Sequence, residues 1–329
     1  MTANLANGWD SSTAESTVAK EAAAAVLKLP AAQGNKALPS LISYLAFEAP
    51  MIDALPFMFL RRNPDKSAHD TDVLARAKRL AVAGRILVAR IRWLDEMLDY
   101  KEPLGTPEDV HRLSAAVYKE ALDYFAACLV ETDEMACFFK LLADLEACYA
   151  TSLAIDAASC RVPGVAWTSV RVNLESYAAQ ARARAILASA PVEAQMIVMK
   201  ASKEEQQRVR ECLRSLTVAW QLYDDVLDLE EDYRDGRLSW IISETLRNLH
   251  GYNYSFGTDA FYEAALLGGY VHNALRQCQA FYRKAECAAD GMFPEVGNFA
   301  RSEIRKTTEL IADLTGIVSS ASQDEAASS

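Results

Sequence analysis

The stretch of sequence that decides the fold lies between positions 220 and 237 and reads Trp220-Gln221-Leu222-Tyr223-Asp224-Asp225-Val226-Leu227-Asp228-Leu229-Glu230-Glu231-Asp232-Tyr233-Arg234-Asp235-Gly236-Arg237. Its apolar residues recur at three- and four-residue spacings, which predicts a helix. Seven acidic residues fall between positions 224 and 235. At about 100° per residue, five of them share one helix face: Asp224, Asp228, Glu231, Asp232 and Asp235. The stretch therefore predicts a helix whose carboxylates gather on one side.

Carboxylates gathered in this way repel one another, since like charges four residues apart destabilise a helix. A bound cation would relieve that repulsion, whereas a solvated surface face is the simpler alternative. Upstream, the same face carries Gln221, Trp220, Thr217 and Leu213 in place of further charge. A face that changes from carboxylates to apolar and aromatic groups favours a cavity wall with a metal site at its mouth.

A second acidic motif lies earlier in the chain and reads Arg92-Trp93-Leu94-Asp95-Glu96-Met97-Leu98-Asp99. Asp95 and Asp99 are four residues apart, so they point the same way from a helix. Further back, the same face carries Val88, Gly84 and Ala81, whose small or apolar side chains would leave room for a substrate. An ordinary amphipathic helix end is the alternative for this motif taken alone.

The rest of the chain favours an all-α fold. Hydrophobic residues make up 51% of the 329 residues, and glycine (13) and proline (10) are sparse, which is typical of long helices. We expect an antiparallel helical bundle around a central cavity, in one domain at 17–318 between disordered segments at 1–16 and 319–329. The helical periodicity covers these ranges: 69–100, 107–130, 133–160, 168–189, 203–235, 239–250, 259–289 and 297–317.

Charge and cysteine usage exclude several classes of protein. The net charge of -11 argues against nucleic acid as a partner. The seven cysteines form no CxxC pair and are expected to be reduced core residues, and the four scattered histidines give little support to a zinc site. Neither a signal peptide nor a transmembrane segment is indicated, so we expect a cytoplasmic protein.

Together the two acidic motifs resemble those of the class I isoprenoid synthase superfamily, which includes polyprenyl diphosphate synthases, phytoene and squalene synthases, and terpene cyclases. Asp95-Glu96-Met97-Leu98-Asp99 is similar to the first aspartate-rich motif, in the variant with Glu as the second acid. The run from Gln221 to Asp228 looks like the second motif of chain-elongating enzymes. In another frame, the run from Gln221 to Arg237 is similar to phytoene synthases, and a third frame aligns Asp224, Asp228 and Asp232 with the metal triad of terpene cyclases.

This resemblance implies a set of ligands and a substrate. Asp95 and Asp99 would hold magnesium from one side and Asp224, Asp228 and Asp232 from the other, and these five aspartates are the candidate catalytic residues. The resemblance implies three Mg²⁺ ions, with Mn²⁺ as a substitute, and a prenyl diphosphate substrate. Monomer and homodimer are both left open. The candidate substrate-binding residues are Arg234, Arg237, Gln221, Trp220 and Tyr149.

Further residues are weaker candidates, for which core or surface placement is the simpler interpretation. Arg182, Arg184, Arg283 and Lys284 are candidates for diphosphate contacts, and Phe138 and Phe139 for stabilising a carbocation. Glu96, Asp225 and Glu231 are candidates for orienting the metal ligands.

Departures from the family pattern guide the choice of reaction. Elongating enzymes have an arginine pair after the first motif and an early Gly-Gly-Lys segment, whereas Asp99 is followed by Tyr100-Lys101-Glu102 and only Arg61-Arg62 hints at an early basic pair. We therefore expect a terpene synthase, a lyase that ionises one prenyl diphosphate, of farnesyl length or longer, to a cyclised or rearranged terpene. The alternatives are a prenyltransferase, either chain-elongating or of the head-to-head phytoene and squalene type, and a non-catalytic helical scaffold.

Overall fold

The computed structural model of the chain describes residues 11–46, 50–60, 71–100, 106–159, 172–248 and 258–328. Within these ranges it contains fourteen α-helices and no β-strand, so the predicted all-α class is confirmed. The chain divides into two compact units. The first contains Met1–Glu146 and Leu187–Gln206, and the second contains Ala147–Ile186 and Gln207–Ser329.

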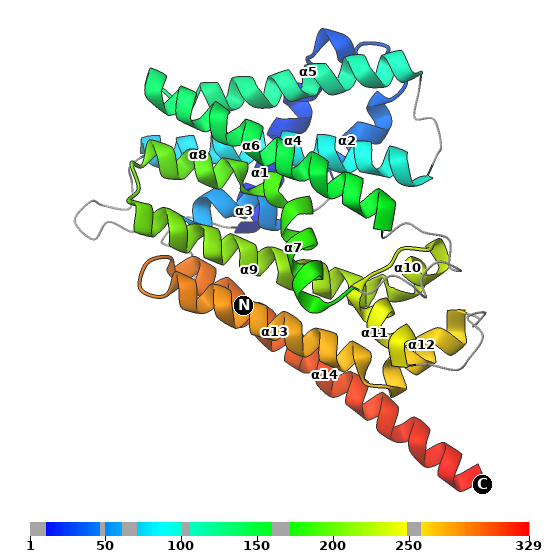
Figure 1. Ribbon diagram of the computed structural model, residues 1–329. Helices are drawn as coiled ribbons and strands as arrows, with labels where there is room; N and C mark the ends of the chain where they lie inside the picture. The colour runs from blue at the N-terminus through cyan, green and yellow to red at the C-terminus, as the bar shows by residue number, and fades with distance from the viewer. Residues whose placement is uncertain are drawn as a thin grey trace. The chain divides into compact units, whose positions relative to one another are not determined.

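Helix α4 (Thr71–Tyr100) forms the centre of the first unit. Residues 80–87 are buried without exception, because other helices pack on several sides of it. These helices are α1 (Ser11–Leu27), α2 (Leu38–Ala46), α3 (Pro50–Met58), α5 (Pro107–Ala126) and α8 (Ala190–Val198), and Figure 1 labels each of them. The 3-10 helix η1 (Pro30–Ala32) connects α1 to α2.

Close packing between α4 and α8 corrects one expectation from the sequence. A Cβ atom added to Gly84 would lie only 2.7 Å from Cγ of Pro191. The space beside Gly84, predicted to accommodate a substrate, is therefore filled by the pyrrolidine ring of α8. Glycine is needed here because any side chain would displace that ring.

A buried charge joins the N-terminal helices to α4. The Arg85 guanidinium donates hydrogen bonds to the Leu45 carbonyl oxygen, at 3.3 and 3.2 Å, and lies 3.5 Å from the Asp53 carboxylate. Both charged side chains are only 3% exposed. Because an unpaired buried charge is costly, this pair links the end of α2 to α3 and α4.

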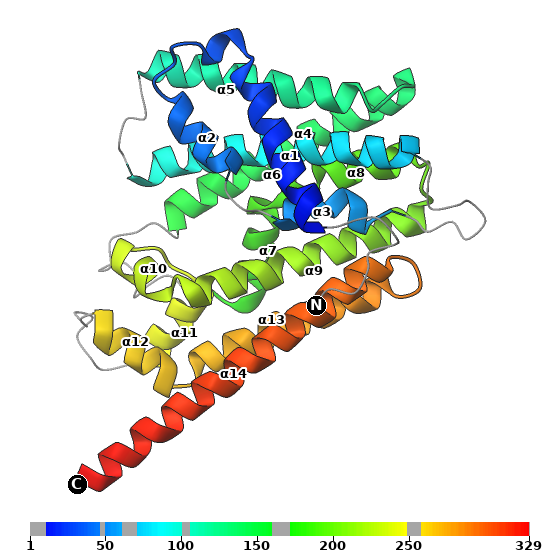
Figure 2. The ribbon, with the colours of Figure 1, turned by 180° about the vertical axis from the view of Figure 1, so that it is seen from behind.

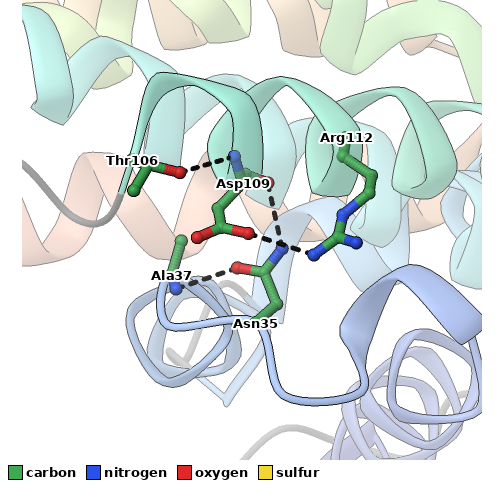
Figure 3. A network of polar contacts seen from close by, with 5 residues as sticks. All are labelled: Asn35, Ala37, Thr106, Asp109 and Arg112. Atoms are coloured by element: carbon green, nitrogen blue, oxygen red, sulfur yellow. Dashed lines mark hydrogen bonds and ion pairs between the residues drawn. The ribbon is translucent and has the colours of Figure 1, made fainter.

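The start of α5 is fixed by a polar network, which Figure 3 shows from close by. The Thr106 hydroxyl accepts a hydrogen bond from the Asp109 backbone N–H at 3.1 Å, so Thr106 is the N-cap of α5. The Asn35 amide donates to the Asp109 carbonyl oxygen at 2.9 Å, and its oxygen accepts from the Ala37 N–H. The Asp109 carboxylate pairs with Arg112 at 3.0 Å. One asparagine thereby ties the segment before α2 to the first turn of α5.

The second unit contains most of the C-terminal helices. Helices α13 (Tyr270–Ala289) and α14 (Pro294–Ser328) pack along one another, as Figures 1 and 2 both show. The Cys278 thiol of α13 donates to the Ala219 carbonyl oxygen of α9 (Lys203–Leu227) at 3.1 Å. Helix α7 (Leu174–Arg184) contacts α6 (Thr132–Ser159) through the Gln180 amide, which donates to the Ser152 carbonyl oxygen at 2.6 Å.

Three short helices complete the second unit: α10 (Leu229–Asp235), α11 (Trp240–Asn248) and α12 (Thr258–Leu267). The rings of Tyr233 and Phe261 stack at a centroid distance of 3.8 Å, with 1° between their planes. Phe261 is fully buried, so this contact anchors α10 on α12.

Several helix boundaries differ from those predicted. The single helix expected at 203–235 is two helices, α9 and α10, which meet at Asp228. The helix expected at 259–289 divides at Gly268-Gly269 into α12 and α13, and Gly269 has a φ of 74°. The range 168–189 holds α7 and the 3-10 helix η3 (Ile186–Ser189) in its described part, and helices α1, α2, α3 and α8 had not been predicted.

The cysteines that the structure describes are all free thiols. Cys128, Cys212 and Cys278 are buried as predicted, but Cys137 and Cys287 are exposed, so the expectation of core placement was wrong for those two. Within the described residues, no helix has the length and apolar character needed to cross a membrane.

Candidate functional site

The acidic stretch lies at the junction of α9 and α10 in the second unit. At Asp228 the backbone leaves the helical region, with φ at -96° and ψ at 9°. Hydrogen bonds nevertheless continue across the break, because the Asp228 N–H donates to the Asp224 carbonyl oxygen at 2.9 Å and the Asp232 N–H donates to the Asp228 carbonyl oxygen at 2.8 Å. The three aspartates therefore follow one another at intervals of one turn.

A glycine turn ends α10 and brings an arginine back towards the acids. Gly236 has a φ of 78°, a left-handed conformation that favours glycine. The Arg237 N–H then donates to the Asp232 carbonyl oxygen at 2.8 Å, as in a Schellman motif. The Arg237 guanidinium lies 3.5 Å from the carboxylates of both Asp232 and Asp235. Arg237 thus offsets part of the negative charge of α10.

Asp225 is held in the protein interior, at 5% exposure, by side chains of two helices. The Tyr177 hydroxyl of α7 donates to one carboxylate oxygen at 2.7 Å, and the Gln221 amide donates to the other at 2.9 Å. Burial raises the pKa of Asp225 to about 6, although both hydrogen bonds act to lower it. Burial also raises the pKa of Tyr177, with a further contribution from Asp225, so its hydroxyl stays protonated and can donate.

The neighbouring aspartates have raised pKa values too. Burial, followed by the negative charge of Asp225, raises the pKa of Asp232 to about 7, while Arg237 acts in the opposite direction. Partial burial and the charge of Glu231 raise the pKa of Asp228. The exposed Asp224 contributes to the shifts of both Asp225 and Asp232. The charged forms of these carboxylates are therefore disfavoured. A bound cation would stabilise the charged forms, so the cluster is suited to bind one.

The other residues predicted to bind substrate also lie in the second unit, and they differ in their contacts and exposure. Gln221 contacts Asp225 as described, and Trp220 packs edge-on against Phe299 of α14 at a centroid distance of 6.2 Å. Arg234 is exposed and lies 3.5 Å from Asp235. Tyr149 is half-buried on α6. The substrate-binding roles of Trp220, Gln221, Arg234 and Tyr149 stay predictions.

The first acidic motif belongs to the first unit. Asp95 is half-buried near the end of α4, and the side chains of Glu96 and Asp99 lie outside the described residues. A joint metal site formed by both motifs therefore stays a prediction, as does the central cavity. In the part of the chain that the structure describes, no three His, Cys, Asp or Glu side chains converge to enclose a metal ion by themselves.

Sequence reasoning missed Tyr177, the donor to Asp225. Its residue type and position carry no signal of that contact, because its partner lies 48 residues away on another helix. Arg184, predicted only as a weaker candidate, contributes a positive charge that lowers the pKa of Asp225. Both side chains belong to α7, so the placement of this helix beside Asp225 brings them to the site.

Neither protein-family models nor curated proteins match this chain. Solved structures do match it. A geranylgeranyl pyrophosphate synthetase from Pyrococcus horikoshii Ot3 gives a TM-score of 0.68 at 13% identity, covering 89% of this chain and 97% of that one. Octaprenyl pyrophosphate synthase from Helicobacter pylori gives 0.65 at 13% identity, covering 89% and 99%.

A third similar structure is a polyprenyl synthase from Caulobacter crescentus CB15 complexed with calcium and isoprenyl diphosphate. It gives a TM-score of 0.66 at 14% identity and covers 88% of this chain and 94% of that one. The chain therefore has the helical fold of these synthases over most of its length, as the resemblance of its motifs to the class I isoprenoid synthase superfamily implied.

Proposed function

We propose that this protein is a magnesium-dependent prenyltransferase, which extends an allylic prenyl diphosphate with a second prenyl diphosphate. The observation that carries the proposal is the acidic cluster at the end of α9, in which burial raises the pKa of Asp225 to about 6 and that of Asp232 to about 7. The solved structures with a similar fold are named as prenyl diphosphate synthases. This similarity favours prenyl transfer over the terpene synthase reaction expected from the sequence.

The cluster suits magnesium in its chemistry. Magnesium prefers oxygen ligands, keeps several waters and is usually bound by one or two carboxylates together with substrate phosphates. A site in which no three described side chains enclose an ion is compatible with that mode of binding. Asp224, Asp228 and Asp232 are the proposed ligands on the second unit, and the first motif adds Asp95 and Asp99. Bound magnesium would supply Lewis-acid stabilisation of the departing diphosphate.

The protein's own side chains prepare the cluster for that role. Tyr177 and Gln221 occupy both oxygens of Asp225, so this carboxylate is positioned as a fixed negative charge behind the proposed ligands. Arg237 lies between Asp232 and Asp235 and is the proposed contact for a phosphate oxygen, because a guanidinium fork matches phosphate geometry. Arg234 is the second proposed contact.

A reaction with one substrate is the second candidate, and one feature of the sequence favours it. After Asp99 the chain continues Tyr100-Lys101-Glu102, without the arginine pair that elongating enzymes carry. A protein with one diphosphate site would ionise its substrate and release a hydrocarbon or an alcohol. The two candidates share the metal cluster and differ only in the acceptor.

Product analysis separates the two candidates. The purified protein would be incubated with magnesium and each of dimethylallyl, geranyl, farnesyl and geranylgeranyl diphosphate, with and without isopentenyl diphosphate. We expect longer prenyl diphosphates only when isopentenyl diphosphate is present. A hydrocarbon or alcohol formed without it would support the single-substrate reaction, and unchanged substrates in every mixture would refute both.

A matched pair of variants tests the proposed cluster. Asp228→Ala should abolish product formation, whereas Asp313→Asn, which alters an exposed acid on α14, should leave it unchanged. Equal product formation by Asp228→Ala and the unaltered protein would show that Asp228 belongs to a solvated helix face and is not a metal ligand.

A further inference from the structure

The turn between α13 and α14 (Figure 1) borders an open hollow of about 390 Å³, a volume within the range of pockets that bind small molecules. Its lining comes from the last turn of α13, the linking segment and the first turns of α14. Phe293 and Ala289, which are 2% and 1% exposed, supply apolar surface. The charged residues Glu286, Asp290 and Arg301 line the hollow as well. The hollow therefore combines apolar surface with a small number of charged groups.

Hydrogen bonds hold the backbone of this turn in place. Arg208 of α9 donates to the Ala288 carbonyl oxygen at 2.9 Å and also to the Asp290 carbonyl oxygen. The Met292 N–H donates to the Ala289 carbonyl oxygen at 3.0 Å. Because these contacts fix the segment that lines the hollow, a ligand would enter a site that is already formed.

A glycine leaves space on the side of the hollow that belongs to α14. Gly297 is buried, and the nearest neighbours of a Cβ added there would be three atoms of the Arg301 guanidinium, at 3.5, 3.7 and 3.9 Å. These are ordinary contact distances to the end of a flexible side chain, so this position could hold a larger residue. The absence of a side chain therefore leaves the space beside the guanidinium unfilled.

Asp290 carries the uncompensated charge of the hollow. The Glu286 carboxylate is paired with Arg301 at 2.7 Å, and the Arg301 guanidinium also donates to the Asn298 amide oxygen at 2.7 Å. Arg208 is bonded to backbone carbonyl oxygens instead of to a carboxylate. Among the described residues, no hydrogen bond or ion pair reaches the exposed carboxylate of Asp290. A ligand with a positive charge would complement this arrangement.

The hollow is separate from the acidic cluster at the other end of α9. Arg208 lies in the first two turns of this helix, and Asp224 lies in its last turn. At about 1.5 Å per residue, about 24 Å of helix lies between them. A small molecule bound in the hollow therefore does not contact the acidic cluster.

We propose that the hollow binds a small organic ammonium ion that carries a hydrocarbon group. The ammonium group would donate to the Asp290 carboxylate, and the hydrocarbon would pack on Phe293 and Ala289. Hydrogen bonds between charged groups are stronger than those between neutral ones, so the ammonium group supplies the specificity. This site is independent of the proposed reaction.

Cys287 reports whether the hollow is occupied, because its exposed thiol lines the hollow. The rate at which iodoacetamide alkylates Cys287 in the full chain would be measured by mass spectrometry with increasing phenethylamine. Cys137, an exposed thiol on α6, is the internal control. We expect the amine to slow the alkylation of Cys287 and to leave that of Cys137 unchanged. An unchanged rate at Cys287 up to about 10 mM amine would overturn the proposal.

Two matched probes test the recognition of charge. Phenethyl alcohol has a similar ring and chain without a charge, and hydrocinnamate carries a carboxylate in place of the ammonium group. The amine should protect Cys287 at a concentration about tenfold lower than the alcohol does, because it forms a charge-assisted contact. Hydrocinnamate should protect least. Equal protection by all three probes would show that the hollow takes up an adventitious additive only, and the proposal would be wrong.

Asp290→Asn assigns the contact to the free carboxylate. The variant should need about tenfold more amine for the same protection of Cys287, whereas its response to phenethyl alcohol should be unchanged. Asp313→Asn alters an exposed acid on α14 and is the matched control, which should respond as the unaltered protein does. The same amine dependence in both variants would refute the role of Asp290.

Gly297→Leu tests the hollow itself, since the added side chain would occupy the space beside Arg301. This variant should lose the protection of Cys287 by the amine. Gly316→Leu, on the same helix with nothing near its added Cβ, should keep it. Full protection in Gly297→Leu would show that the amine binds elsewhere. None of these measurements needs magnesium or a prenyl substrate, so their failure would leave the proposed reaction standing.

Discussion

Tyr177→Phe tests how the interior of the acidic cluster is held together. The substitution removes only the hydroxyl that donates to Asp225 at 2.7 Å and leaves the ring in place. A hydrogen bond to a charged group contributes about 1.5–3 kcal/mol, against about 0.5–1.5 kcal/mol for one between neutral groups. Asp225 is buried, so water cannot replace the lost donor. The variant should therefore be less stable, by an amount that depends on the charge of Asp225.

The pH dependence follows from the raised pKa of Asp225. Its usual pKa of 3.8 is raised to about 6 in the folded protein. Between these two values the folded chain binds more protons than the unfolded chain, so this group makes the free energy of unfolding fall as the pH rises. Removing the Tyr177 hydroxyl eliminates a contact that lowers the pKa of Asp225, so this pKa is higher in the variant. The free energy of unfolding of the variant therefore continues to fall up to a higher pH.

The measurement is urea unfolding in metal-free buffer at about pH 5 and about pH 8. The gap in free energy of unfolding between the unaltered protein and Tyr177→Phe should be about 0.5–1.5 kcal/mol at the lower pH and about 1.5–3 kcal/mol at the higher one. Tyr262→Phe, an exposed hydroxyl on α12, is the control and should change stability little at either pH. A gap of the same size at both pH values would refute the reasoning.

Three further substitutions probe the backbone and charge of the same protein. Gly236→Ala places a side chain at a φ of 78° and should lower stability by about 1–2 kcal/mol in thermal melts, whereas Gly316→Ala, with nothing near its added Cβ, should not. Gly84→Val should lower stability by about 1–3 kcal/mol, because its Cβ would meet Pro191; an unchanged melting temperature would contradict the close contact of α4 with α8. Asp232→Asn should have a higher melting temperature than the unaltered protein in EDTA at about pH 8, because a carboxylate with a pKa of about 7 destabilises the fold when it is charged. The same variant should lose part of the rise in melting temperature that magnesium gives. If magnesium raises both proteins equally, Asp232 is not a ligand.

The helices that the sequence predicted well are those with a strong local signal. The helix expected from residue 203 begins there because of a capping box, in which the Ser202 N–H donates to the Glu205 carboxylate and the Glu205 N–H donates to the Ser202 hydroxyl. Such features depend only on residues close together in the chain.

The helices that were missed form through packing instead. Helix α1 is rich in alanine and has no pronounced apolar face, yet Val18, Ala22 and Val26 are buried where it packs on α4. Helix α3 contains Pro56, which by itself predicts a break. Contacts with distant segments stabilise both helices, and no local pattern records them.

The acidic stretch shows why a face drawn from an ideal helix predicts only part of a site. At about 100° per residue, Asp224, Asp228 and Asp232 were predicted to share one helix face. The helix is interrupted at Asp228, but the hydrogen bonds that continue across the break preserve the one-turn spacing of these three aspartates. The ideal helix could not predict that Asp225 would be buried, because burial depends on α7 bringing Tyr177 to it from 48 residues away. The spacing of Asp224, Asp228 and Asp232 depends only on the local backbone. The raised pKa values of Asp225 and Asp232 depend on how the helices of the unit pack around them. The sequence can therefore propose which acids bind a cation, but only the fold explains why their charged forms are disfavoured without one.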